Sequence, residues 1–360
     1  MRRIGALLTL LLVCCSVHAD ETWGLKPGKV ELKSASVLAF GPNDVLFVGD
    51  TKAATIFAIA TGDTDGDPAS SKFDNKNIQS NLDDMFGSKT KVNDLVVNPK
   101  TGNLFLACEA DGKAMIVHVT DGGRKMNQLS LADMKFSKAV LKNAPEDKAS
   151  GRRRRNPRND SITDLAFYEG KVLVSGLRSL GSASSVREID FPFFKADQGI
   201  GVQIYHAAHG RDEDTAAMRT FVPLTIDGEP TLLAAYVCTP LVKIPLKELK
   251  SAGEKVTGTT VAELGNRNRP LDMITYQKDG DDYLLLSNSA RGVMKIPTDG
   301  LKENAGLSKR VSGGGTAGQP FETIKAFEGV VQMAKLNETH AVLLVKKGDG
   351  PVALTTVELP

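Results

Sequence analysis

Carboxylate and amide side chains recur at one position of a repeated pattern, and they are the residues of this sequence best suited to bind a ligand. Asp94, Asp164 and Asp272 each precede a short apolar run, and Gln332 stands at the matching position near the C-terminal end. Oxygen donors gathered in this way suit a hard cation such as Ca²⁺, which takes about six to eight oxygens. In the alternative interpretation, these aspartates hydrogen-bond backbone N–H groups where strands begin.

Polar residues in the neighbouring turns are expected to join this group. They come from the loops that lie beside the strand starts when repeated units radiate from one axis. The predicted ligand-binding set is Asp94, Asp164, Asp272, Gln332, Glu109, Arg178, Asn288 and Arg291, with Asp50 as a further neighbour.

A histidine pair is a second candidate metal site. His206 and His209 stand three residues apart, with Asp212, Glu213 and Asp214 close behind. On one turn of chain, the two imidazoles could ligate a transition metal. No third or fourth ligand follows at a recognised spacing, and histidines also serve as ordinary hydrogen-bonding side chains.

Alternating acids form a third candidate. Asp63, Asp65 and Asp67 are followed by Asp74 at the twelfth place, as in a calcium-binding loop. Pro68 stands where such a loop needs glycine, so an acidic turn between strands is the alternative.

A run of arginines, residues 152–155 with Arg158, makes a dense positive patch. Such a cluster can pair with carboxylates or phosphates. A solvated, protease-sensitive loop is the alternative. If the patch binds a partner, an acidic protein or a polysaccharide fits better than DNA.

Motifs for covalent catalysis are absent from the sequence. There is no G-x-S-x-G elbow, no cysteine adjacent to a histidine and no phosphate-binding loop, since the glycine-rich residues 312–318 lack a following lysine. Cys108 and Cys238 remain after the signal peptide is removed, and they are expected to be separate thiols in different repeat units.

The repeated unit is clearest in residues 270–297, where two short apolar runs and an alternating run are joined by turns rich in Asp, Gly and Ser. Such runs predict three antiparallel strands. The unit recurs six times, beginning at residues 36, 94, 164, 220, 272 and 332. Repeats of this length predict an all-β fold, a six-bladed β-propeller, with seven blades as the alternative.

Fourth, outer strands are predicted at residues 201–205, 257–264 and 322–327. The last unit lacks one, and residues 29–33 are expected to supply it, so that both termini close the ring in one blade. Surface insertions are expected near residues 70–91, with a short helix at 81–86, and near 132–159. Residues 20–360 would then form a single propeller domain.

This pattern resembles the six-bladed propeller superfamily that includes the NHL-repeat and gluconolactonase-like proteins. The resemblance covers nearly the whole chain after residue 19, without a signature motif of one family. Gluconolactonase-like enzymes hold a metal through carboxylates and amides at the same place in the ring, which implies a cation near Asp94, Asp164 and Asp272.

The N-terminal residues 1–19 are typical of a signal peptide, with a basic start, an apolar run of about 14 residues and a small residue at Ala19. The run is shorter than the roughly 20 residues of a membrane span. Cleavage leaves 43 basic and 43 acidic residues, which argues against nucleic-acid binding. A periplasmic or secreted monomer is expected.

Two functions remain open from the sequence. The first is a binding or interaction module whose channel face takes a protein, a glycan or a small molecule. The second is a metal-dependent hydrolase or lactonase, in which a cation held by Asp94, Asp164 and Asp272 polarises a carbonyl or activates water. The fold alone does not choose between them.

Overall fold

Short apolar runs between glycine- and aspartate-rich turns fold into strands throughout this protein. The computed structural model describes residues 23–149, 154–194, 198–251 and 253–360. The predicted signal peptide, residues 1–19, lies outside the described residues. Within the described part of the chain, none of the helices combines the length and apolar character needed to cross a membrane.

Five sheets account for the strands of the described residues. The first has the order β1-β10-β4-β3-β2, with β1 (Lys26–Gly28), β10 (Met134–Val140), β4 (Thr55–Ala60), β3 (Val45–Asp50) and β2 (Val37–Phe40). The second comprises β6 (Lys91–Val97), β7 (Leu104–Ala110), β8 (Lys113–Thr120) and β9 (Lys125–Gln128). The third comprises β20 (Pro270–Lys278), β21 (Asp281–Asn288), β22 (Gly292–Pro297) and β24 (Glu322–Thr323). The fourth comprises β25 (Val330–Lys335), β26 (His340–Lys346), β27 (Val352–Glu358) and β5 (Asp74–Asn75).

The fifth sheet joins two repeat units, because β14 pairs in parallel with β19. It comprises β11 (Asp164–Tyr168), β12 (Lys171–Leu177), β13 (Ser184–Asp190), β14 (Ile200–His206), β15 (Arg211–Glu213), β16 (Met218–Ile226), β17 (Glu229–Tyr236), β18 (Pro240–Pro245), β19 (Lys255–Glu263) and β23 (Ala317–Gly318). The short helices are α1 (Ile78–Phe86), α2 (Leu246–Ser251) and the 3₁₀ turns Asp121–Gly123, Pro157–Asp160 and Lys325–Phe327.

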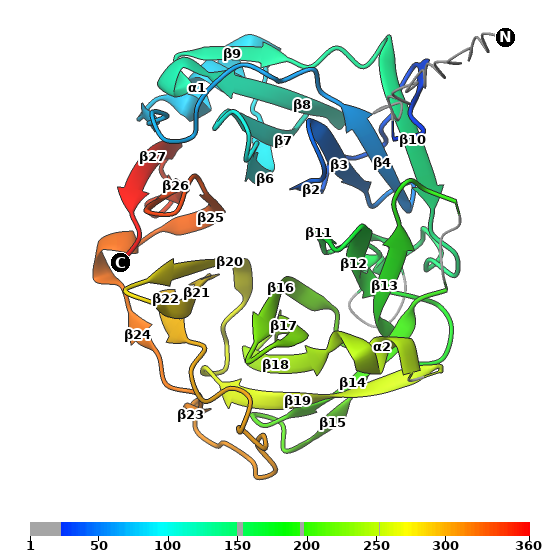
Figure 1. The fold of residues 1–360 in the computed structure, drawn as a ribbon, viewed down its shortest axis with the longest axis vertical. Coiled ribbons are helices and arrows are strands. Elements are labelled where there is room, and N and C mark those ends of the chain that lie inside the picture. The colour runs from blue at the N-terminus through cyan, green and yellow to red at the C-terminus, as the bar shows by residue number, and fades with distance from the viewer. Residues whose placement is uncertain (1–22, 150–153, 195–197, 252) are drawn as a thin grey trace, which may run out of the picture.

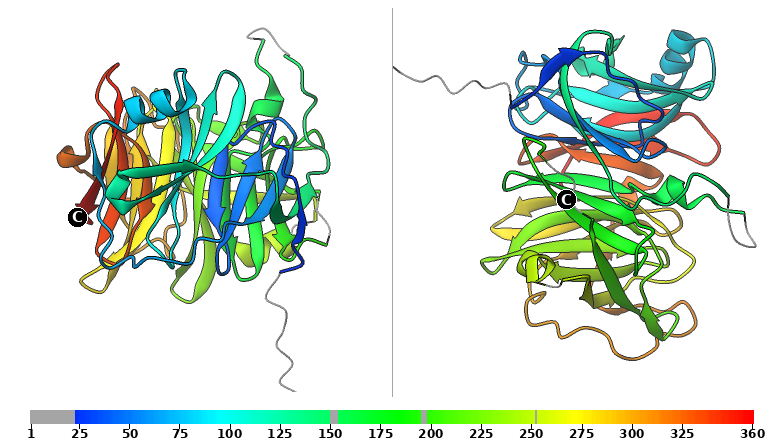
Figure 2. Two further views of the ribbon diagram at one scale, coloured as in Figure 1. Left: turned by 90° about the horizontal axis from the view of Figure 1, so that it is seen from above. Right: turned by 90° about the vertical axis from the view of Figure 1, so that its right-hand side faces the viewer.

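The sheets radiate from a common centre, which gives an all-β, propeller-like fold (Figure 1). The innermost strands follow one another around the centre in the order β6, β2, β11, β16, β20, β25 and back to β6. Seen from the side, the strands of neighbouring sheets stand next to one another (Figure 2). Hydrophobic side chains fill the space between adjacent sheets, as where Leu106 of β7 and Leu344 of β26 share one core cluster with Leu82 of α1.

The sheet closure differs from the sequence prediction. We expected residues 29–33 to complete the last unit, but β5 pairs with β27, and the N-terminal β1 pairs with β10 in another sheet. The prediction that both termini lie in one sheet was therefore wrong. The physical reason is the apolar character of the segment around β5. Phe73 and Ile78 are buried in the cluster beside β27, whereas Lys29 and Glu31 are exposed and pair with each other.

The predicted insertions also differ in part. Residues 132–159 were expected to form a surface loop, but they contain β10, which pairs with β4 along five residue pairs. The chain thus leaves the first sheet after β4, builds β5 and the whole second sheet, and returns to complete the first sheet. Helix α1 overlaps the helix predicted at residues 81–86, and it ends where Gly87 takes a left-handed conformation.

The predicted outer strands at residues 201–205, 257–264 and 322–327 are confirmed as β14, β19 and the shorter β24. The six predicted repeat units all begin with an inner strand of the structure. The connection between β22 and β24 contains β23 and loops out beyond β19 (Figures 1 and 2).

The pairing of β5 with β27 leads to a first prediction. The Phe73 N–H donates to Thr356 Oγ1 at 2.7 Å, and the Thr356 N–H donates to the Phe73 carbonyl at 2.7 Å. Thr356→Val removes the first acceptor and keeps the shape, so we expect a loss of about 1 to 2 kcal/mol in the free energy of unfolding. Amides of β5 and β27 should exchange faster. Chemical denaturation and hydrogen exchange measure both.

Thr355→Val is the matched control for this prediction. Thr355 is adjacent on β27, and among the described residues its hydroxyl makes only a long contact of 3.5 Å to the Thr356 carbonyl. Equal effects of the two variants would show that the Phe73 hydrogen bond does not hold the sheet closed.

Candidate functional site

A cavity of about 440 Å³ opens where the inner strands begin. The residues at the matching position of the six inner strands all line it: Asp94, Val37, Asp164, Thr220, Asp272 and Gln332, in their order around the centre. In the first unit this position is one residue after the predicted start at residue 36. Aspartates thus stand on every second strand. The repeat pattern therefore brings together the three carboxylates that the sequence analysis singled out.

Each aspartate ties its own strand to the next one. Asp94 accepts the Leu95 N–H on Oδ1 at 2.9 Å, and the Leu38 N–H of the adjacent β2 on Oδ2 at 2.6 Å. The same two bonds recur at Asp164, from Leu165 and Phe221, both at 2.8 Å, and at Asp272, from Met273 at 2.7 Å and Met333 at 2.6 Å. Backbone bonding, the alternative role considered for these aspartates, is therefore part of what they do.

Gln332 bridges two of the carboxylates. With its amide oriented to satisfy the hydrogen-bonding groups around it, its nitrogen donates to Asp94 Oδ1 at 2.9 Å and to Asp272 Oδ2 at 3.0 Å. Its strand, β25, lies between the strands of these two aspartates. The amide of Gln332 therefore partly compensates two negative charges at the floor of the cavity.

Electrostatic repulsion remains at this floor, because three half-buried carboxylates line the same cavity. Burial and then the charge of Asp164 raise the pKa of Asp94 to about 8. Burial raises the pKa of Asp164 to about 6, and burial followed by the charge of Asp94 raises the pKa of Asp272 well above its ordinary value. All three pKa values are therefore shifted in the same direction, toward the protonated form.

The carboxylates are not arranged as direct ligands of one ion. Across the described residues, the group of His, Cys, Asp or Glu whose ligand atoms all lie within 4.8 Å of one another is His206, His209 and Cys238. The oxygens of Asp94, Asp164 and Asp272 are therefore more widely spread. In this conformation the three aspartates do not form a group within that spacing, and the cation site stays a prediction.

Positive side chains form the rim of the same cavity. Lys52, Lys91, Arg219 and Arg269 line it, together with the predicted Glu109. Arg219 pairs with Asp160 at 2.6 Å, while its buried Nε has no hydrogen-bond partner among the described residues. Lys52 and Glu109 lie 3.9 Å apart, at the limit of an ion pair.

Arg269 lies in a positive environment. The residue as a whole is exposed, but protein atoms crowd its guanidinium. This partial burial, and then repulsion from Arg219, lower the pKa of Arg269; Asp160 partly offsets the decrease, and Arg155 adds to it. An anion bound at Arg269 would relieve this repulsion.

A second hollow of about 880 Å³ adjoins the rim and shares Arg219 and Arg269 with the first cavity. Arg154 and Arg155 of the predicted arginine patch also line it, whereas Arg152 and Arg153 lie outside the described residues. The arginine run thus continues the positive surface of the cavity rim.

Four of the residues that were expected beside the strand starts lie elsewhere. Arg178 donates to the carbonyls of Ser182 and Glu254. Asn288 donates to the carbonyls of Leu286 and Gly292, and Arg291 donates to those of Asn266 and Gly314. The Asp50 carboxylate accepts the backbone N–H groups of Lys33, Ser34 and Ala53. None of these four described residues lines the cavity.

The acidic run was expected to be either a calcium loop or an ordinary turn, and the structure favours the turn. Asp63 is buried and accepts hydrogen bonds from Asn98 at 2.7 Å, Thr101 at 2.5 Å and Asn103 at 2.8 Å. Burial alone would raise its pKa, but His118 and these three donors lower the pKa of Asp63 to about 2. Asp74 is in strand β5, so the loop does not wrap around one centre.

The sequence analysis missed the positive rim. Arg219 directly precedes Thr220, and Arg269 stands three residues before Asp272. Inspecting the residues just before each repeat start would have found both. Cys108 and Cys238 are separate free thiols, as predicted.

Comparisons with known proteins give only distant likenesses. No family model and no curated protein matches this chain. It resembles the β-propeller domain of Cps50 (Swd1) from Myceliophteria thermophila, with 11% identity over 90% of this chain and 83% of that one, at a TM-score of 0.38. It also resembles a putative 6-phosphogluconolactonase from Bacteroides uniformis, with 11% identity over 88% of this chain and 78% of that one, at a TM-score of 0.34. A third likeness is to a PQQ-bound aldose sugar dehydrogenase from Streptomyces coelicolor, with 10% identity over 92% of this chain and 98% of that one, at a TM-score of 0.33. Likenesses at these TM-scores assign this chain neither a family nor an activity.

Proposed function

We propose that this protein is a binding module that takes a small, hydroxyl-bearing anion in the cavity at the centre of its ring. The observation that carries the proposal is that basic and acidic side chains line the same cavity. Lys52, Lys91, Arg219 and Arg269 line it together with the carboxylates of Asp94, Asp164 and Asp272. A carboxylate or phosphate group would pair with the rim, and hydroxyl groups would bond to the floor.

Unmet bonding capacity at the rim supports this assignment. The buried Nε of Arg219 lacks a partner among the described residues, and Arg269 faces other guanidinium groups. A buried donor without a partner costs about 1 to 3 kcal/mol. A bound anion that accepts from these groups would recover part of that cost.

Metal-dependent hydrolysis is less well supported. The three floor carboxylates already accept backbone N–H groups, and they do not form a group whose ligand atoms all lie within 4.8 Å of one another. If a cation nevertheless served as the reactive centre, Ca²⁺ or Mg²⁺ would raise the melting temperature, and Asp164→Ala would abolish the shift.

We also propose six blades, an exported protein and a monomer. The six inner strands that close around the centre support the blade count. The N-terminal residues 1–19 support export through their basic and apolar composition. Size-exclusion chromatography with light scattering tests the oligomeric state, and N-terminal sequencing of the exported protein tests cleavage after Ala19.

Titration calorimetry with glucuronate, inorganic phosphate and glucose tests the binding proposal. Glucuronate should bind, glucose should bind more weakly because it lacks the charge, and phosphate should compete with glucuronate. Arg269→Ala should weaken glucuronate binding about 10- to 100-fold, because a charge-assisted hydrogen bond contributes about 1.5 to 3 kcal/mol.

Arg267→Ala is the matched control, since Arg267 is exposed nearby but does not line the cavity. It should bind glucuronate as the unmodified protein does. Equal affinity for glucose and glucuronate, or equal loss in the two arginine variants, would overturn the assignment of an anion to the rim.

A further inference from the structure

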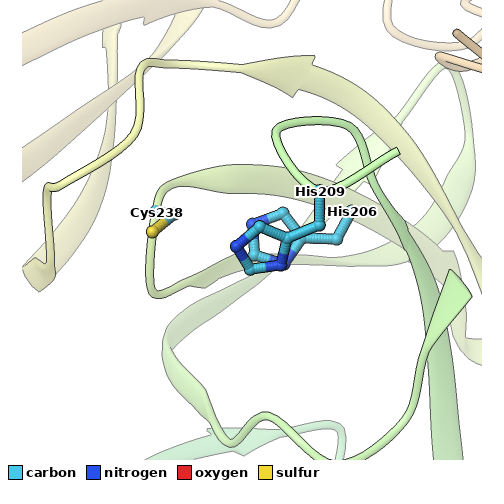
Figure 3. A group of neighbouring side chains, drawn as sticks. All are labelled: His206, His209 and Cys238. Atoms are coloured by element: carbon cyan, nitrogen blue, oxygen red, sulfur yellow. The ribbon is translucent and has the colours of Figure 1, made fainter. Parts of the chain in front are cut away.

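Two histidines and a cysteine meet outside the central cavity. His206 ends β14 and His209 lies in the turn before β15, whereas Cys238 comes from the turn between β17 and β18. One ligand atom from each of the three residues lies within 4.8 Å of those of the other two. Figure 3 shows the two imidazoles side by side, with Cys238 across from them on its own turn. Their ring centroids are 3.8 Å apart.

A single carboxylate orients both imidazoles. Glu213 contacts His206 Nδ1 with Oε2 and His209 Nδ1 with Oε1, both at 2.8 Å. The Nε2 atoms are thereby left as the coordinating nitrogens. A carboxylate on the far nitrogen of a histidine is the usual support of a metal-bound imidazole, because it fixes the ring and increases its basicity.

Two buried polar atoms at this place have no partner among the described residues. One is Nε2 of His206, a residue only 2% exposed. The other is Oε1 of the fully buried Glu263, whose Oε2 accepts the N–H of Ala208 between the two histidines at 3.0 Å. Buried polar atoms normally have hydrogen-bond partners, so two such atoms without partners indicate that a bound ion or water belongs here.

The cysteine is held in position by its turn. The Cys238 N–H donates to the Asn268 carbonyl at 2.8 Å, and the following Thr239 N–H donates to the Tyr236 carbonyl at 2.9 Å. Both Cys238 and Thr239 have positive φ, +67° and +56°. In the matching turn of the second sheet, Asp111 and Gly112 take the positive φ values, which is the usual residue choice for this backbone.

We propose that His206, His209 and Cys238 bind one transition-metal ion, Zn²⁺, with a fourth position open to water or a small ligand. Two imidazole nitrogens and a thiolate are donors that zinc takes, whereas Ca²⁺ and Mg²⁺ require oxygen. Glu213 acts as a positioning residue. Glu263 offers an acceptor to a water on the metal.

Metal analysis and cobalt substitution test this site. The full chain as purified should contain one zinc per protein, and chelation followed by Co²⁺ should give the near-ultraviolet absorption of a cobalt–thiolate bond. Cys238→Ser should remove that absorption. His209→Gln, at a side chain that is 44% exposed, should bind Zn²⁺ more than about 100-fold more weakly, since even the loss of a supporting residue costs about 10- to 100-fold.

Glu213→Gln separates the positioning role from ligation. It should weaken Zn²⁺ binding about 10- to 100-fold while keeping the cobalt–thiolate absorption. His340→Gln, at a histidine bonded to Thr339 outside the group, is the control and should change neither readout.

Three outcomes would overturn the proposal. They are no saturable binding of Zn²⁺ or Co²⁺, a cobalt complex without thiolate absorption, and unchanged affinity in a folded His209→Gln protein. Copper in the purified protein would overturn the zinc assignment. Circular dichroism confirms that each variant is folded. Glucuronate binding to the central cavity should be unaffected in these variants, so this test and that of the proposed function fail independently.

Discussion

The free energy of unfolding should fall as the pH rises from about 4 to about 8. Asp94, with a pKa of about 8, and Asp164, with a pKa of about 6, hold protons in the folded protein that an exposed aspartate has lost above about pH 4. Asp272 acts in the same direction, because its pKa is also raised.

The sign follows from proton linkage. Over this range the folded state binds more protons than the unfolded state, so stability decreases with increasing pH. The contribution is fully present below the unfolded pKa and is lost as the pH passes through the folded values. Each proton held only by the folded state changes the free energy of unfolding by up to about 1.4 kcal/mol per pH unit.

Asp94→Asn should flatten this dependence between about pH 6 and pH 8. The variant removes one proton-binding group, and it also removes the charge that raises the pKa of Asp272. Absolute stability should fall at low pH, because an amide has one acceptor oxygen where Asp94 accepts from both Leu38 and Leu95. Denaturant unfolding at a series of pH values gives the slope, which is the quantity to compare.

Other groups titrate in the same pH range. The contribution of the three aspartates is therefore given by the difference in pH slope between the Asp94→Asn variant and the parent protein. Burial raises the pKa of Glu263 to about 7, which adds to the decrease. Burial lowers the pKa of His206, which opposes it. Asp111→Asn, in an exposed turn, is the control. An identical slope in Asp94→Asn and the parent protein would show that Asp94 is ionised throughout.

The second large effect is expected from Gly176→Ala. Gly176 lies in β12 with a φ of +156°, and a Cβ added there would stand 2.2 Å from the carbonyl oxygen of Ser161 and 2.5 Å from its carbonyl carbon. Backbone cannot move aside as a flexible side chain does. We expect a loss of about 3 to 6 kcal/mol in the free energy of unfolding, from overpacking and backbone strain together.

The same substitution should also change the shape of the central cavity. Ser161 is followed by Ile162 and Thr163, which line that cavity beside Asp164. Displacement of this segment should therefore weaken glucuronate binding in any protein that still folds. Denaturant unfolding and calorimetry measure the two effects.

Gly170→Ala provides the comparison. Gly170 has a φ of +76° in the turn between β11 and β12, and among the described residues, its chain neighbours aside, no atom lies within 4 Å of an added Cβ. It should cost only about 1 to 2 kcal/mol from the left-handed backbone. Similar losses in both variants would show that contact with Ser161 is not what requires glycine at residue 176.

The three aspartates were predictable because their positions follow from a local repeat. Each stands at the start of an apolar run, and equivalent runs in a ring begin at one face. Their spread, however, depends on which backbone N–H groups the neighbouring strands present. The backbone hydrogen bonds that these aspartates accept from Leu38, Phe221 and Met333 were therefore visible only in the structure.

The sequence by itself determined the strands, their turns and the repeat that aligns Asp94, Asp164 and Asp272, because apolar runs and turn residues act over short distances. Only the tertiary structure decided which segments close the sheets and which residues share a site. The pairing of β5 with β27, and the meeting of Cys238 with His206 and His209, join residues far apart in the chain. Such contacts depend on burial of apolar surface and on free strand edges, which no local pattern encodes.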